Sequence, residues 1–156
     1  MNFEELNPTT RQCMLDEFEQ EEVGGNPYRG RLLSPEGNTV FANLMRQAIL
    51  SGNEQTLIRS LANSQYWQPF ENYSKGARRV NVHQQAERLG LSEFNTWYVR
   101  GFSKRLLQES VTHCEVYRAG EPKGARETCS FYEGQVFLVE EVYQGHRAQY
   151  WPVRRP

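Results

Sequence analysis

The chain has few cysteines, and their spacing argues against a disulfide framework or a zinc site. Of 156 residues only Cys13, Cys114 and Cys129 are cysteine. An odd number leaves one thiol over if a disulfide forms, and no Cys-x-x-Cys pair is present to hold zinc. We therefore expect the protein to work in a reducing compartment.

Long apolar runs are also missing. No stretch approaches the length of a membrane span, so we expect no membrane contact. Residues 1–5 hold two acids and no base, which argues against a secretory signal peptide. Both absences predict a cytoplasmic location unless the protein becomes part of a larger particle.

Motifs for catalysis, metals and cofactors are absent too. The histidines lie at 83, 113 and 146, without metal-ligand spacing, and the glycines form neither a phosphate loop nor a dinucleotide fingerprint. His113 and Cys114 are neighbours in a predicted strand and so point to opposite faces. A pair between Cys129 and a distant histidine stays open. We expect no enzyme, no catalytic or metal residues and no cofactor.

Lysine is scarce, whereas arginine and aromatic residues are frequent. Fifteen of the eighteen basic residues are arginine, and aromatics make up 12% of the chain. Protein interfaces favour arginine, tyrosine, tryptophan and phenylalanine and disfavour lysine. The composition indicates a contact surface, although biased genomic composition produces the same excess.

Charge is unevenly distributed along a chain whose net charge is only −1. Residues 1–25 hold seven acids and one base, a balance of −6, and residues 75–108 hold seven bases and two acids, a balance of +5. Such blocks steer partners or attract copies of the same chain head to tail. The alternative is that two helices of one molecule neutralise each other.

Helices dominate the first part of the chain. We expect one over residues 8–23, because Asn7 is a good cap and proline suits the first helical position. Ser34 and Pro35 are expected to open a second, amphipathic helix at residues 35–51, and Asn53 to cap a short third one.

An aromatic stretch follows at residues 63–75, without a clear period. We expect a long loop that binds a partner, the alternative being a loop pinned to its own core. Together with the basic aromatic tail, it supplies the predicted partner-binding residues: Tyr66, Trp67, Phe70, Tyr73, Tyr150, Trp151, Arg154 and Arg155.

The C-terminal third has strand composition. We expect a strand at 111–118, a turn at 119–128 and an edge strand at 148–153, while 135–143 fits either a strand or a short helix that Gly145 ends. The prediction is a single α+β domain over 1–156, with a helical N-terminal two-thirds and a small antiparallel C-terminal sheet.

The central residues 83–107 fit a DNA-binding helix-turn-helix in part. A short helix at 83–89, Gly90 as the turn and Ser92 as the cap of a longer helix at 92–110 match the generic pattern. Arg100, Lys104 and Arg105 would then contact phosphates.

The same segment fits a packing helix better. Aromatic residues occupy turns that would face the bases, and the sequence is slightly acidic overall. Phe94, Trp97, Tyr98 and Leu106 instead share one helical face. Gly101 lies on that face, which predicts the close approach of another backbone.

The run S-E-F-N-T-W-Y-V-R-G-F-S-K-R-L-L, followed by C-E-V-Y-R-A-G, resembles a segment of uncharacterised bacterial and phage proteins, and R-L-L-S at 31–34 is similar too. The resemblance implies a component of a phage head, neck or tail and assigns no active residues. We therefore expect a non-enzymatic structural protein, in a virion or the cytoplasm, that contacts copies of itself or other virion proteins. The alternative is a helix-turn-helix DNA-binding protein.

Overall fold

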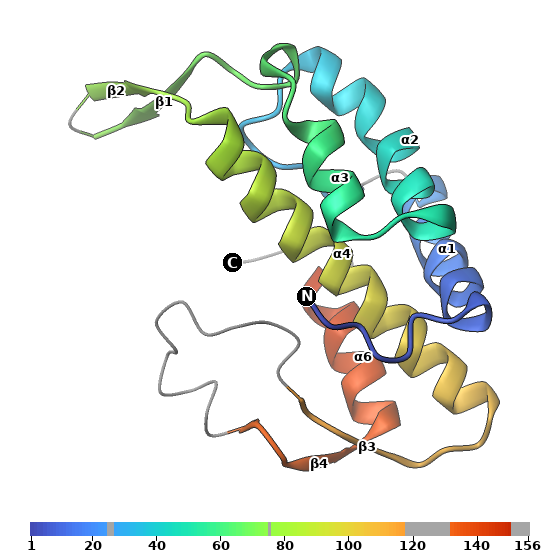
Figure 1. Cartoon of the computed structure of the whole chain (residues 1–156). Coiled ribbons are helices and arrows are strands. Elements are labelled where there is room, and N and C mark those ends of the chain that lie inside the picture. Colours follow the sequence, from blue (N-terminus) through green and yellow to red (C-terminus); the bar gives the residue numbers. More distant parts are fainter. Residues whose placement is uncertain (25–26, 75, 118–131, 151–156) are drawn as a thin grey trace.

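The computed structural model describes residues 1–24, 27–74, 76–117 and 132–150 (Figure 1). The elements are α1 (Pro8–Val23), α2 (Pro35–Ser51), α3 (Glu54–Leu61), the 3-10 turn η1 (Ser64–Tyr66), β1 (Phe70–Tyr73), β2 (Gly76–Arg79), α4 (Val82–Gln108), β3 (His113–Glu115), β4 (Val136–Leu138) and α6 (Val139–Tyr150). The predicted α+β class, with mostly N-terminal helices and small antiparallel sheets, is confirmed.

The first three helices begin at the predicted caps. Asn7 accepts a hydrogen bond from the backbone N–H of Thr10 at 2.9 Å, and Ser34 accepts one from Gly37 at 3.0 Å. Asn53 forms a capping box with Thr56. These bonds satisfy backbone donors that a helix start leaves without partners, which is why short polar side chains set the boundaries.

Helix α4 is the spine of the molecule, and α1, α3 and α6 pack on it (Figure 1). It runs unbroken from Val82 to Gln108, so the predicted division into two helices with a turn at Gly90 is wrong. A side-chain carbon added at Gly90 would lie 2.6 Å from Ile58 Cγ1. Glycine thus leaves room for the Ile58 side chain of α3 to pack closely against α4. Ser92 donates its hydroxyl to the Leu89 carbonyl and caps no helix.

The aromatic face of α4 is the predicted core. Phe94 is fully buried, while Trp97 is 2% and Tyr98 3% exposed. Trp97 meets Phe18 of α1 edge to face, with ring centroids 5.1 Å apart. The expected close approach at Gly101 is also present, because a side-chain carbon there would lie 2.5 Å from the Met14 nitrogen. Burial of such rings contributes a few kcal/mol each, on the order of 2.

Two small sheets lie at opposite ends of the molecule (Figure 1). The β1–β2 hairpin pairs Phe70 with Arg79 and Glu71 with Arg78, so most of the predicted aromatic loop is a short turn followed by a strand. The β3–β4 sheet pairs His113 with Leu138.

The C-terminal segment differs from the expected pattern. Residues 135–143 contain both alternatives, because strand β4 leads directly into helix α6. Gly145 lies inside α6 and does not end it, and the expected edge strand is wrong for residues 148–150, which are helical. Residues 119–128 and 151–153 of the other predicted elements lie outside the described part of the chain. No described helix has the length and apolarity needed to cross a membrane.

Candidate interaction surface

The opposed charge blocks meet inside the molecule. Arg100 of α4 is fully buried, and its guanidinium lies 2.7 Å from Glu21 and 3.4 Å from Glu17, both on α1. The same guanidinium lies over the Trp97 ring, 4.4 Å from its centroid. The alternative of two helices that neutralise each other therefore describes this interface.

The other two predicted phosphate contacts are engaged in the same way. Lys104 Nζ lies 3.3 Å from Glu17 Oε1, and Arg105 Nη2 lies 2.8 Å from Glu5 Oε2. With α4 continuous and its three cations directed at carboxylates, the geometry does not support a helix-turn-helix role for residues 83–107.

Glu93 is a buried carboxyl that sequence reasoning did not single out. Burial, together with the nearby negative charge of Glu21, raises its pKa to about 8, against the opposing effect of Arg29 and Arg100. The side chain therefore holds its proton at neutral pH. Glu93 is 6% exposed and belongs to the core. It lines neither of the two cavities at the ends of α4.

The described cysteines and histidines give little support for a nucleophilic thiol or a metal site. Burial raises the pKa of the Cys13 and Cys114 thiols, which disfavours a reactive thiolate. Cys129 lies outside the described residues. Among those that are described, no group of three histidine, cysteine or acidic side chains is arranged to hold a metal ion.

The predicted partner-binding aromatics divide into core and surface. Trp67 is only 5% exposed, and its indole N–H donates to the Leu61 carbonyl at 2.7 Å. Its prediction as a contact residue is wrong, because it anchors the segment to the core. Tyr66 is half-buried against the same core. Phe70 and Tyr73 on β1 are 56% and 42% exposed.

The predicted tail residues are mostly beyond the described chain. Tyr150 is the last residue of α6, and Trp151, Arg154 and Arg155 lie outside the described residues.

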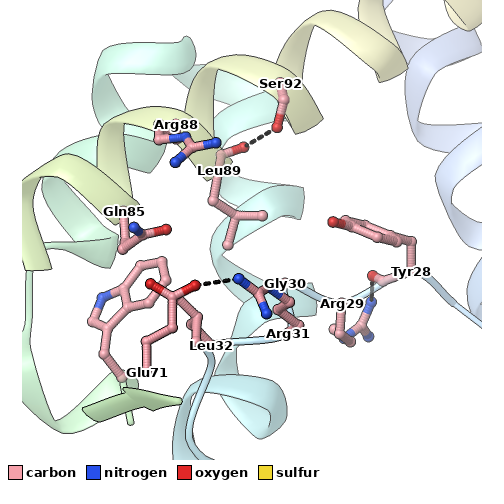
Figure 2. A pocket seen from close by; sticks show the side chains of 11 residues that line it. Tyr28, Arg29, Gly30, Arg31, Leu32, Glu71, Gln85, Arg88, Leu89 and Ser92 are labelled. Carbon is pink, nitrogen blue, oxygen red and sulfur yellow. Dashed lines mark hydrogen bonds and ion pairs between the residues drawn. The ribbon is translucent and has the colours of Figure 1, made fainter. Parts of the chain in front are cut away.

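A cavity of about 350 Å³ opens at the base of the β1–β2 hairpin (Figure 2). Leu32, Trp67 and Leu89 supply its apolar lining, and Leu89 points from α4 toward the ion pair of Glu71 with Arg31. Glu71 is 6% exposed and also lies 3.1 Å from Arg78 across the hairpin. The carboxylate thus ties the hairpin to the loop before α2.

Positive charge and exposed aromatic rings coincide at this end of α4. We define the basic aromatic surface as the exposed rings and arginines on and beside the hairpin: Phe70, Tyr73, Arg31, Arg78, Arg79 and Arg88. Phe70 and Arg79 lie on one face of the hairpin, and Tyr73 and Arg78 lie on the other. Two of its four arginines, Arg31 and Arg78, form ion pairs with Glu71. The four arginines and this carboxylate together carry a charge of 4 − 1 = +3. Arg79 and Arg88 are exposed and have no ion-pair partner within the described ranges.

The Arg78 guanidinium lies over the Tyr73 ring, 5.0 Å from its centroid, which holds both side chains in place. Sequence reasoning missed Arg31, Arg78, Arg79 and Arg88 as one surface. The run of bases from residue 75 onward was the available signal, but it also includes the buried Arg100.

Comparisons with protein-family models, curated proteins and solved structures find no match for this chain. The function is therefore argued from the chemical character of the exposed residues.

Proposed function

We propose that the protein is a non-enzymatic structural protein that makes subunit contacts in an assembly of the phage-virion kind, through the basic aromatic surface. The observation that carries the proposal is the pair of exposed rings, Phe70 and Tyr73, on a hairpin that projects from the helical body (Figure 1). A lone two-stranded hairpin is marginally stable, and exposed rings on it gain free energy when a partner covers them.

The chemistry of the surface is that of an interface core. Aromatic rings contribute large contact areas, and planar guanidinium groups stack on rings and bind carboxylates with two hydrogen bonds. Arg78 is already held over Tyr73, so less rotamer entropy is lost when a partner binds. Both strands of the two-stranded sheet also keep an outer edge that can extend the ladder.

The ion pairs between α1 and α4 reduce the number of surfaces that can bind a partner molecule. The acidic helix and the buried arginine cannot serve as a docking pair between molecules, because each is the other's partner. The hairpin end keeps its positive charge. The resemblance of residues 92–107 to bacterial and phage proteins makes a virion the setting we favour, with copies of this chain or other virion proteins as partners.

Self-association tests the proposal directly. Light scattering coupled to gel filtration should show a mass that rises with protein concentration for the natural sequence. The double variant Phe70→Ser/Tyr73→Ser should stay monomeric. Leu50→Ser is a matched control, because Leu50 is 54% exposed at the end of α2, where Arg11 of α1 donates to the Ile49 and Gly52 carbonyls.

The control variant should associate like the natural protein. A natural protein that remains a monomer at every concentration and binds duplex DNA with a steep dependence on salt would contradict the proposal, and so would a double variant that associates as well as the Leu50→Ser control.

A further inference from the structure

A second cavity, of about 370 Å³, lies near the C-terminal end of α4. Phe102 and Leu106 supply its apolar lining, and the acidic side chains of Glu4, Glu5 and Glu115 surround them. We call these five residues the acidic pocket. His113 and Cys114 of strand β3 complete the wall on one side.

The acidic pocket keeps negative charge available for a partner. Glu4 and Glu115 are exposed and have no ion pair within the described ranges, whereas Glu5 shares Arg105. Glu4 accepts a hydrogen bond from the Asn2 side chain at 3.1 Å. An apolar floor beside exposed carboxylates suits a ligand that presents an apolar side chain next to a cation.

The basic aromatic surface of this protein has that chemistry. It places exposed aromatic rings beside arginines, of which Arg79 is unpaired in the described part of the chain. One molecule cannot bring the two surfaces together. Leu89 and Leu106 border the two cavities and are 17 residues apart on one helix, a distance of about 25 Å. The two complementary surfaces can therefore meet only between two copies.

We propose that the acidic pocket of one copy receives the β1–β2 hairpin of a second copy, so that the chain assembles head to tail. This inference rests on the proposed function and names the partner and the geometry of its contact. Phe70, which lies opposite Arg79 in the hairpin, packs against the exposed part of Phe102. Arg79 lies beside Glu115 or Glu4.

Charge favours this geometry over a two-fold contact between hairpins. A symmetric contact would place Arg78 and Arg79 of one copy against the same residues of the other, and like charges in an interface are unfavourable. The head-to-tail contact pairs opposite charges. Because its two surfaces differ, it repeats and builds a ring or a filament.

Two variants that each disable one surface test the geometry. The head variant, Phe70→Ser/Arg79→Gln, keeps the acidic pocket, and the tail variant, Glu4→Arg/Glu115→Arg, keeps the hairpin. All four positions are exposed, so both variants should fold, which circular dichroism checks. Each variant alone should need a concentration about tenfold higher, or more, to associate.

Mixing the two variants should restore association but stop it at one molecule of each, because only one intact junction can form. Gln47→Arg, at an exposed position of α2, controls for added charge and should associate like the natural protein. The milder Glu115→Gln change should weaken association less than the tail variant does.

The outcomes separate the two proposals. If the tail variant associates like the natural protein while the head variant is monomeric, the head-to-tail geometry is wrong and the proposed function stands. The same holds if the mixture gives no one-to-one dimer although the natural protein associates. A natural protein that is always monomeric overturns the head-to-tail assembly, and contacts with other virion proteins are then what the proposed function rests on.

Discussion

Replacing Gly101 by alanine should destabilise the protein, because the added methyl group collides with the backbone of α1. It would lie 2.5 Å from the Met14 nitrogen, 2.5 Å from Met14 Cγ and 2.7 Å from Met14 Cα. Non-bonded heavy atoms normally stay about 3.5–4.0 Å apart. The methionine side chain can rotate away, but its backbone nitrogen and Cα cannot. Helix α1 must therefore move outward by about 1 Å.

The free-energy cost of Gly101→Ala depends on the contacts that the movement of α1 disturbs. Overpacking a well-packed interior typically costs about 1–3 kcal/mol, and the same interface contains the Arg100 ion pairs and the contact between Phe18 and Trp97. Alanine offsets about 1 kcal/mol of this because it is the better helix former. We expect a net loss of up to about 2 kcal/mol, which corresponds to a Tm lowered by up to roughly 4–8 °C in a protein of this size.

Two other glycines provide matched controls for this change. Gly145 of α6 has nothing within 4 Å of the added carbon, so alanine there should stabilise the protein by about 0.5–1 kcal/mol. At Gly90 the nearest atom, 2.6 Å away, belongs to the Ile58 side chain, while the backbone nitrogen is 3.3 Å away. This variant should fall between the other two.

Urea unfolding of the three variants and the natural protein measures this order. A Gly101→Ala variant as stable as Gly145→Ala would refute the close approach of α1 to α4. A stability of Gly90→Ala below that of Gly101→Ala would show that the side chain of Ile58 yields less readily than the helix backbone.

Three further predictions concern the same interface. Trp97→Ala should cost about 3–5 kcal/mol in urea unfolding, and a variant of natural stability would show that the ring is not core. Arg100→Gln should cost about 3–5 kcal/mol in urea unfolding, because Glu21 loses the guanidinium of Arg100 and Glu17 keeps only Lys104 as a cationic partner; a variant of natural stability would contradict that reason. For Glu93, the raised folded pKa of about 8 means that the folded state holds the proton more tightly than the unfolded chain, whose carboxyl titrates near 4.5. This contribution is complete below pH 4.5 and is lost as the pH rises through 8, so Glu93→Gln should raise Tm at pH 9 but hardly at pH 4; an equal gain at both would refute the assignment.

Local hydrogen bonding and helical periodicity were sufficient for several features. Asn7, Ser34 and Asn53 cap the helices as expected, because a cap needs only a side-chain acceptor within three residues of the backbone donor. The aromatic face of α4 was also predictable, since residues three or four apart share a face of any helix. The sequence also predicted Phe70 and Tyr73 of the hairpin as surface residues. Trp67, close to them in the chain, was predicted as a surface residue too but lies in the core.

Contacts between distant segments decided the rest. The charge of residues 1–25 and 75–108 is visible in the sequence, but their mutual neutralisation depends on Arg100 meeting Glu17 and Glu21 about 80 positions earlier in the chain. Glycine at position 90 suits a turn and a tight helix contact equally well, and only the presence of Ile58 decides between them.

The same physical reason separates the two ends of the aromatic stretch. Trp67 and Phe70 have similar local surroundings in the sequence, yet one is core and the other exposed, because Trp67 faces Leu61 and Phe70 leaves the body with the hairpin. The composition of the chain alone indicated that arginine and aromatic side chains would form packing and ion-pair contacts. Tertiary structure determined which of them are used inside the molecule and which remain at its two ends.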